Sequence, residues 1–398
     1  MRIGSADRAE HLTYCTNIHA GETWDEIFSR LEANLPAIKA EACPNEPMGV
    51  GLRVSAIAAE ALSAPERLAA FQEFLADGDY YVFTINGFPY GPFHGQRVKE
   101  QVYQPDWSFE ERLSYSDRMA DLLAAMLPDG MSGSISTVPG TFKPLASEAG
   151  RVEAITDHLL RHVARLIDIE RAAGKTIALA LEPEPYCFLE TIEETVQYFE
   201  RRLFARDACR RLGSLTGLSS SAAEAALRRH LGVCYDVCHA AVEYEDPKGS
   251  VEALRAAGIA VPKVQLSAAL RIPEVTTDTP STLRGFDEPV YLHQVIERRH
   301  DRLLRHLDLP DALATLDDAI GHEWRVHFHV PIFLDELQHF STTQDFLRDI
   351  LAIHRKTPIA DHLEVETYTW DVLPERYRGV DVSTAIAREL NWVRKELS

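Results

Sequence analysis

Short runs rich in β-branched and aromatic residues alternate along the chain with longer stretches whose apolar residues recur every three or four positions. The short runs predict strands at 12–18, 49–55, 80–86, 132–138, 176–182, 231–237, 262–268 and 362–368. The longer stretches predict amphipathic helices, most clearly over 23–40, 108–127 and 150–174, the last of which should stop at Gly174. Repeated β-then-α units favour a parallel sheet, and eight of them favour closure. We therefore expect an α/β fold, a (β/α)8 TIM barrel.

One further run, WRVHFHVP (324–331), is a ninth strand candidate, and the stretch 271–323 before it is longer than a simple crossover. We assign 271–331 to an elaborated connection after the seventh strand, so that HLEVETY (362–368) closes the barrel. A second insertion, 201–230, follows the fifth strand. The chain shows no internal repeat and no linker, which predicts a single domain over 1–398. The pattern leaves open whether residues 1–10 are ordered.

Composition narrows the possible partners. The formal net charge of −20 repels phosphate backbones and anionic membrane surfaces, so we expect no nucleic-acid partner. Six cysteines without a CxxC motif are too few for a disulfide scaffold and predict a cytoplasmic protein with reduced thiols. The chain has neither a run of 18 apolar residues nor the apolar segment of a secretory signal, which argues against membrane insertion and export. A homo-oligomer is compatible with these features.

Residues that bind metals stand at the ends of consecutive predicted strands, where TIM barrels place their active sites. The fifth strand ends in Glu182, and the sixth ends in Asp236 with His239 three residues later. The seventh carries Gln265, and the eighth carries Glu366 near its end. Three carboxylates, an amide oxygen and an imidazole suit Mn²⁺, Mg²⁺, Co²⁺ or Zn²⁺. Without a cation the carboxylates would repel one another.

Each of these residues also has an ordinary structural interpretation. A glutamate at a strand end is commonly a surface ion-pair partner, and Asp236 and His239 could be a helix N-cap and a core histidine. The order Glu, Asp-x-x-His, Gln, Glu on consecutive strand ends favours the metal site.

A second group of residues is assigned to the surroundings of that site. His327 and His329 alternate with Phe328, so in an extended segment both face one way and either bind a metal or line the cavity. The aromatic segment FTINGFPYGPFH (83–94) suits a rigid loop stacking on a ligand, or simple loop packing. The candidate substrate-binding residues are His19, Arg53, Asn86, Tyr90, His94, Trp107 and Arg271.

Four segments carry a resemblance to a known family: HLTYCTNIHAGETWDEIF (11–28), FTINGFPYGPFHGQRVKEQVYQPDW (83–107), LEPEP (181–185) and CYDVCH (234–239). From about Leu12 to about Pro374 the chain resembles the family called "metabolite traffic protein EboE". That family lies within the xylose-isomerase-like TIM-barrel superfamily of sugar isomerases, keto-sugar epimerases and endonuclease-IV-type enzymes. Its members are encoded in bacterial and cyanobacterial secondary-metabolite operons, and the name reflects a proposed role in moving a precursor.

The resemblance implies roles for individual residues. Glu182 and Glu366 match the two metal-bound glutamates that also transfer protons in the epimerases, and Asp236 and Gln265 match the remaining ligands. Many members have histidine where this chain has Gln265. His239 matches a residue close to the substrate oxygens. In the same way, Arg271 resembles the arginine that follows strand seven. The endonuclease branch needs further histidines for three zinc ions, and here His94, His327 and His329 are the candidates.

Three functional hypotheses follow. The first is a divalent-metal-dependent isomerase or epimerase of a small polyhydroxylated metabolite, such as a sugar, cyclitol or hydroxycarbonyl compound, with Glu182 and Glu366 as the catalytic pair. The second is a metal-dependent phosphoester hydrolase of the endonuclease-IV type. The third is a non-catalytic binding or traffic protein, since a fold does not fix a function.

Overall fold

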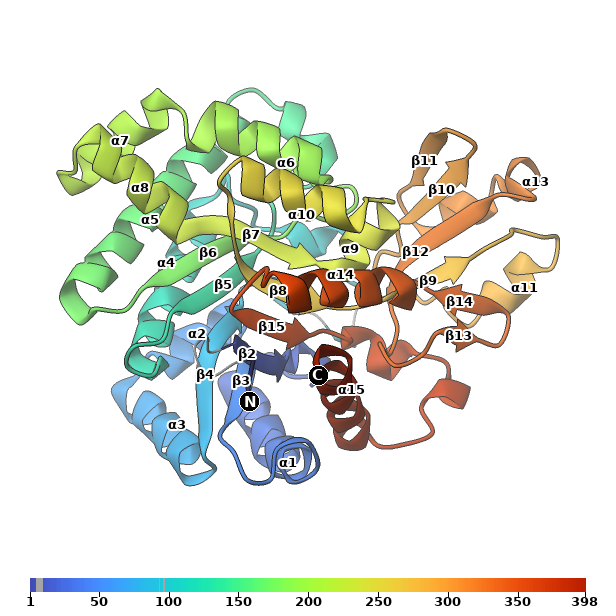
Figure 1. Ribbon diagram of the computed structural model, residues 1–398, viewed down its shortest axis with the longest axis horizontal. Helices are drawn as coiled ribbons and strands as arrows, with labels where there is room; N and C mark the ends of the chain where they lie inside the picture. The colour runs from blue at the N-terminus through green and yellow to red at the C-terminus, as the bar shows by residue number, and fades with distance from the viewer. Residues whose placement is uncertain (5–9, 93, 96) are drawn as a thin grey trace.

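In the computed structural model, which describes residues 1–4, 10–92, 94–95 and 97–398, eight parallel strands form a barrel wall (Figure 1). They are β2 (Glu10–Tyr14), β3 (Met48–Arg53), β4 (Tyr80–Asn86), β5 (Gly133–Thr137), β6 (Ile177–Leu181), β7 (Leu231–Asp236), β8 (Ala260–Leu266) and β15 (His362–Val365). Their order in the sheet is β2-β15-β8-β7-β6-β5-β4-β3. All eight fall within or beside the predicted runs, so the expected (β/α)8 fold is confirmed.

The two ends of this sheet meet between β2 and β3. Cys15 and Gly51 form an isolated parallel bridge. Beside it, the Thr13 hydroxyl donates to the Gly49 carbonyl over 2.8 Å and accepts from the Gly51 amide over 2.9 Å. The Thr13 side chain thus supplies hydrogen bonds between β2 and β3 of the kind that the backbone supplies between the other neighbouring strands. The barrel is therefore nearly closed. The short β1 (Arg2–Ile3) pairs with β2 in antiparallel fashion. Part of the segment 1–10, whose order the sequence left open, lies outside the described residues.

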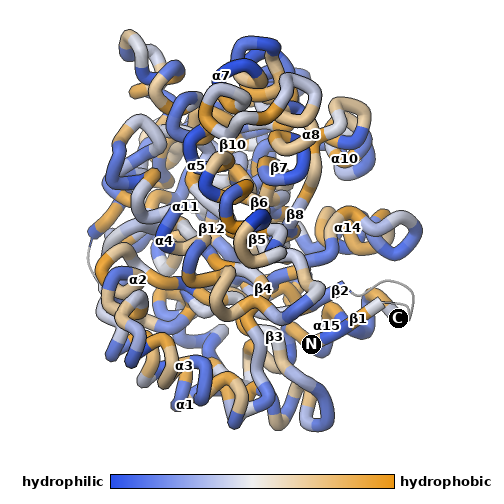
Figure 2. Tube along the Cα trace, turned by 90° about the vertical axis from the view of Figure 1, so that its left-hand side faces the viewer, coloured by the Kyte–Doolittle hydropathy of each residue, from blue (hydrophilic) through white to orange (hydrophobic). Residues whose placement is uncertain are grey.

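Helices surround the wall and pack their apolar faces on it. They are α1 (Trp24–Ala42), α2 (Ala56–Leu62), α3 (Pro65–Asp77), α4 (Glu110–Met126), α5 (Arg151–Ala173), α6 (Ile192–Tyr198), α7 (Arg206–Thr216), α8 (Ser220–His230), α9 (Val237–Val242), α10 (Pro247–Ala256), α14 (Gln344–Lys356) and α15 (Val382–Leu397). A capping box between Thr23 and Glu26 starts α1, and Gly174, with a φ of 66°, ends α5. Figure 2 shows hydrophilic and hydrophobic stretches alternating along these outer helices. No helix in the described part of the chain is both long and apolar enough to span a membrane.

The insertion after strand seven is a second, antiparallel sheet, which lies beside the barrel on the right of Figure 1. Its order is β11-β10-β12-β9-β14-β13. The strands are β9 (Ala269–Ile272), β10 (Val295–Arg299), β11 (Arg302–His306), β12 (Glu323–His329), β13 (Glu336–Leu337) and β14 (Phe340–Thr342), with the short helices α11 (Thr279–Leu283), α12 (Leu309–Leu313) and α13 (Leu316–Ala319) between them. The ninth strand candidate is β12 of this sheet. The insertion extends beyond the predicted 271–331 at both ends, while 201–230 contains α7 and α8.

The barrel interior is polar at mid-height. Lys263 of β8 and Glu364 of β15 are both completely buried, and the Lys263 Nζ lies 2.5 Å from a Glu364 oxygen. A small residue is needed next to this carboxylate, because a Cβ on Gly51 would lie 2.0 Å from Glu364 Oε1. The pair is therefore enclosed in the barrel, two residues before Gln265 and Glu366 in the chain, and so on the same face as these residues.

Candidate metal centre

Three buried carboxylates converge at the carboxyl ends of β6, β7 and β15. Glu182, Asp236 and Glu366 each offer an oxygen, and these oxygens lie within 4.8 Å of one another. The side chains are at most 4% exposed. Because strands 6, 7 and 15 are parallel neighbours or near neighbours in one barrel, their ends meet at the same rim, as the sequence predicted.

Oxygen atoms in this cluster lack hydrogen-bond partners. Glu182 Oε2 and Asp236 Oδ2 are buried without a partner among the described residues. Burial, reinforced by the neighbouring carboxylates, raises the pKa of Glu182 and of Glu366 well above the usual value for glutamate. Two glutamates whose ionised form is disfavoured, beside the Asp236 carboxylate and with oxygens that lack hydrogen-bond partners, fit a divalent cation that would offset their negative charge.

Asp236 combines both roles that the sequence left open. Its Oδ1 accepts from the His239 amide over 3.0 Å, which caps α9, and from the Ser267 hydroxyl over 2.8 Å. Its Oδ2 is left for the cluster. Burial alone would raise the pKa of Asp236, but His239 and His329, together with these hydrogen bonds, hold the pKa below its usual value. The residue is at once a helix N-cap and a potential ligand.

Glu366 is oriented by two amides. The Nδ2 atoms of Asn17 and Asn86 donate to Glu366 Oε1 over 2.8 and 3.0 Å. Asn17 follows β2 and Asn86 ends β4, so donors from two other strands fix one oxygen of this carboxylate. Asn86 was predicted to be near the substrate; Asn17 was not predicted, because an isolated Asn carries no sequence signal.

Three histidines form a second cluster on the insertion side. His239 Nδ1 donates to the Pro183 carbonyl over 3.0 Å, and His329 Nδ1 donates to the Glu366 carbonyl over 2.9 Å. His327 Nδ1 lies 2.8 Å from Gln294 Oε1. The orientation of that amide is fixed, because its Nε2 faces the Pro185 carbonyl, which can only accept.

These three bonds place the proton of each neutral imidazole on Nδ1, so each ring presents an Nε2 lone pair. Nε2 of His239 lies 3.1 Å from Nε2 of His327, and His329 Nε2 is buried without a partner among the described residues. Burial lowers the pKa of His327 well below its usual value and that of His329 to about 4, so these two rings are neutral and each keeps an Nε2 lone pair. A cation would accept such lone pairs, and histidine ligands commonly donate their second N–H as these rings do.

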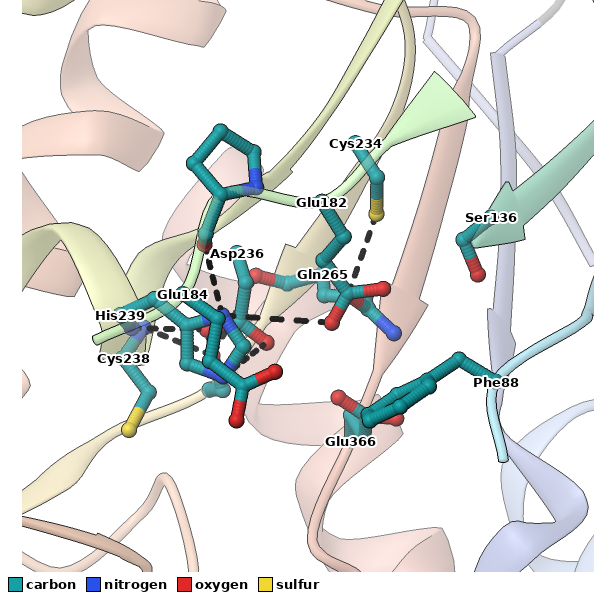
Figure 3. Close-up of polar contacts among 12 residues, drawn as sticks. Phe88, Ser136, Glu182, Glu184, Cys234, Asp236, Cys238, His239, Gln265 and Glu366 are labelled. Atoms are coloured by element: carbon teal, nitrogen blue, oxygen red, sulfur yellow. Dashed lines mark hydrogen bonds and ion pairs between the residues drawn. The ribbon is translucent and has the colours of Figure 1, made fainter. Parts of the chain in front are cut away.

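The second cluster offers three overlapping ligand sets. Asp236 joins His239 and His329 in one, and Glu184 joins His239 and His327 in another. Cys238 joins His327 and His329 in the third, and the ligand atoms of each set lie within 4.8 Å of one another. Figure 3 shows His239 and Glu184 beside Asp236, with dashed contacts from His239 to the Pro183 carbonyl and toward the carboxylates. Asp236 is therefore common to both clusters. Glu184, two residues after Glu182, was not predicted as part of the site.

Gln265 lies in the wall, but its carbonyl oxygen is engaged. The Cys234 thiol donates to Gln265 Oε1 over 3.1 Å, and the side chain is completely buried (Figure 3). Metal binding through that oxygen therefore stays a prediction.

A narrow cleft opens onto both clusters. It encloses about 490 Å³ including its mouth. Glu182, Glu366, His239 and His327 from the predicted set line it. Phe88 and Pro89, from the aromatic segment 83–94 that was predicted to contact a ligand, also line it. The lining further includes residues that were not predicted as part of the site: Asn17, Val98, Lys99, Val102, Tyr103, Glu184, Tyr291, Leu292 and Tyr368.

Several of the predicted substrate-binding residues are not part of the described cleft lining and contact other residues instead. Arg53 is buried and donates to the carbonyls of Gly21 and Gly91. Trp107 is completely buried, and its indole donates to Thr137 Oγ1 over 3.0 Å. Arg271 of β9 pairs with Glu323 of β12 and with Asp345 at the start of α14 instead of lining the cleft.

The remaining three predicted residues lie around the mouth of the barrel. His19 Nε2 lies 3.0 Å from the Tyr14 hydroxyl, and Tyr90 packs edge-on against Tyr115. His94 lines a separate, larger hollow of about 1780 Å³ with Glu22, and this hollow is also open to solvent. Within the described lining of the cleft, none of these three residues appears.

Comparison with known proteins agrees with this architecture. No family model and no curated protein sequence matches the chain. Among solved structures, a xylose-isomerase-like TIM-barrel protein from Mycobacterium smegmatis in complex with magnesium aligns with 99% of this chain and 98% of its own, at 11% identity and a TM-score of 0.51.

Two further structures align over similar lengths. The IOLI protein with a bound zinc atom shares 12% identity over 97% of each chain, with a TM-score of 0.44. The 3-keto-D-glucoside 4-epimerase YcjR from E. coli shares 12% identity over 97% of this chain and 99% of its own, with a TM-score of 0.40. At these identities the similarity establishes architecture: the chain has the fold of the xylose-isomerase-like TIM barrels.

Proposed function

We propose that the protein is a divalent-metal-dependent isomerase or epimerase of a small hydroxycarbonyl metabolite. The observation that carries this proposal is the cluster of Glu182, Asp236 and Glu366, buried at one barrel rim with unpartnered oxygens and open to a cleft. These residues would hold Mn²⁺, Mg²⁺, Co²⁺ or Zn²⁺. When bound, the ion would polarise a substrate carbonyl and offset the negative charge that develops on its oxygen.

Glu182 follows β6 and Glu366 follows β15, two strands that β7 and β8 separate in the wall, and both glutamates line the cleft. One carboxylate removes the proton on the carbon beside the carbonyl, and the other returns a proton to the neighbouring carbon or to the opposite face. Asn17 and Asn86 hold Glu366 by one oxygen and leave its second oxygen toward the cluster. Glu182 has no such amide donors, so the two carboxylates have different environments, as acid and base partners commonly do.

The test is hydrogen exchange at carbon. The Mn²⁺-loaded protein should incorporate deuterium from heavy water into a member of a panel of hydroxyketones, sugars and cyclitols, followed by NMR and mass spectrometry. Glu182→Gln and Glu366→Gln should each abolish this exchange while the protein remains folded. Glu200→Gln, at an exposed position, is the matched control. Absence of exchange across the panel in the metal-loaded wild type would refute the proposal.

A second candidate function is metal-dependent hydrolysis of a small phosphoester. The observation that favours it is the second cluster, because paired ions sharing a carboxylate suit in-line displacement at phosphorus. Metal analysis separates the two functions. One exchangeable Mn²⁺ or Mg²⁺ per chain supports the isomerase, whereas two or more zinc ions per chain together with turnover of a chromogenic phosphoester support the hydrolase.

The resemblance of the N-terminal segment and the LEPEP and CYDVCH motifs to the EboE family supports a place in a secondary-metabolite pathway. Under this proposal the protein would transform a pathway intermediate. Binding of an intermediate without metal-dependent turnover would instead support the traffic role that the family name describes.

A further inference from the structure

The cleft is lined by two kinds of side chain. The carboxylates and imidazoles of the two clusters line it, and so do five apolar residues, here called the apolar side: Phe88, Pro89, Val98, Val102 and Leu292. A free sugar carries hydroxyls around its whole periphery and would leave several of them against this apolar side without partners, which costs binding energy. The lining therefore favours a ligand that is oxygenated at one edge only.

The apolar side includes the end of a stack of rings. Phe142 and Tyr103 lie nearly parallel, with centroids 5.4 Å apart and planes 9° from one another. Tyr103 and Phe88 continue the stack at 5.8 Å and 16°. Phe142 does not line the cleft, whereas Tyr103 and Phe88 do. Phe88 is only partly buried, and it lines the cleft together with Glu366.

The position of Phe88 is set by the same residue that orients Glu366. The Phe88 amide donates to Asn86 Oδ1 over 3.0 Å, and Asn86 Nδ2 donates to Glu366. The stacking surface and the carboxylate are thus held at a fixed separation by one side chain. The cleft encloses about 490 Å³ including its mouth, which suits a small ligand.

An unpartnered acceptor lies at the oxygenated edge. Asn17 is 2% exposed and lines the cleft, and its Oδ1 has no partner among the described residues. The orientation of this amide is fixed, because Nδ2 must face the Glu366 carboxylate, which only accepts. Asn17 Oδ1 therefore calls for a donor from the ligand, and a hydroxyl is the donor that an oxygenated ligand offers.

We propose that the substrate is a flat, unsaturated ring with neighbouring oxygens, at least one of them a hydroxyl. The ring packs on Phe88, the hydroxyl donates to Asn17 Oδ1, and the oxygenated edge faces Glu182 and Glu366. Asn17 and Phe88 are then specificity-determining residues. This inference rests on the proposed metal-dependent function and names the substrate class for that site.

The experiment uses three probes on the Mn²⁺-loaded protein, with dissociation constants measured by calorimetry. Catechol has a flat ring and two neighbouring hydroxyls, butane-2,3-diol has the hydroxyls without the ring, and 1,2-dimethoxybenzene has the ring without a donor. Phe88→Leu should weaken catechol about five-fold through loss of ring stacking and leave butane-2,3-diol unchanged. Phe109→Leu, an aromatic outside the cleft, is the matched control and should change neither.

Asn17→Leu should weaken catechol about five-fold relative to 1,2-dimethoxybenzene, because only catechol donates to Asn17 Oδ1. The ratio of the two dissociation constants removes any effect of the variant on Glu366 that changes the affinity for both probes equally. A crystal structure of the wild-type protein with Mg²⁺ and catechol gives an independent readout if a variant does not fold, and it should show the ring against Phe88.

The outcomes separate this inference from the proposed function. If Mn²⁺ binds but Phe88→Leu affects catechol and butane-2,3-diol equally, or the crystal structure places the ring away from Phe88, the ring inference is overturned and the metal-dependent function stands. If the wild-type protein binds no Mn²⁺, the proposed function fails and this inference fails with it.

Discussion

The buried Lys263–Glu364 pair allows a quantitative test of how the barrel centre is held. Both side chains are completely buried, and their charged atoms are 2.5 Å apart. Lys263 Nζ also donates to Ser136 Oγ over 3.2 Å. Burial alone would lower the pKa of Lys263, but Glu364 raises it above its usual value. Lys263→Met removes the cation and leaves Glu364 charged or forced to take up a proton. A buried charge left alone costs about 3–5 kcal/mol of unfolding free energy.

The assay is urea denaturation of the chelator-treated protein, followed by circular dichroism, for Lys263→Met, Glu364→Gln and the double variant. Each single variant should lose about 3–5 kcal/mol. The double variant should lose clearly less than the sum, because neither charge is left behind. If the loss of the double variant equals the sum of the two single losses to within about 0.5 kcal/mol, the reasoning is refuted, since the two residues would then not act as a pair.

The remaining predictions concern metal binding and pH. Asp236→Asn should weaken Mn²⁺ binding by at least about 100-fold in calorimetry, because Asp236 belongs to both clusters; an unchanged affinity would exclude these clusters as the site. Burial raises the pKa of Glu389 from 4.5 to about 7, so the native state binds an extra proton between these values and stability falls as pH rises through them. Glu389→Gln should recover about 3 kcal/mol at pH 8 relative to wild type and little at pH 4, in urea denaturation; equal effects at both pH values would contradict this. Saturating Mn²⁺ should raise the melting temperature of wild type but not of Asp236→Asn, measured by thermal denaturation.

The strands could be predicted because their side chains alternate or form short apolar runs bounded by turn residues. The parallel order then places every carboxyl end at one rim, so Glu182, Asp236 and Glu366 could be grouped without any contact information. His239 followed from its spacing to Asp236, since α9 begins directly after β7.

The other features of the site and the barrel centre depend on contacts between distant parts of the chain, which the sequence does not show. A lysine such as Lys263 in β8 is expected at the surface, and only the closed barrel shows that it faces Glu364. Arg271 was expected in a loop after strand seven, but the chain continues almost directly into β9, where this side chain pairs with Glu323 across the second sheet. Asn17 and Glu184 gain their roles from partners far away in the chain, Glu366 and Tyr103.

The histidine cluster draws its ligands from two separate sheets. Asp236 and His239 belong to the barrel, whereas His327 and His329 are carried by β12 of the insertion. An ion bound to both Asp236 and His329 would link the antiparallel sheet to the barrel rim. Loss of the ion would then loosen the contact between this sheet and the barrel. The attachment of the insertion to the barrel would then depend on whether the metal site is occupied.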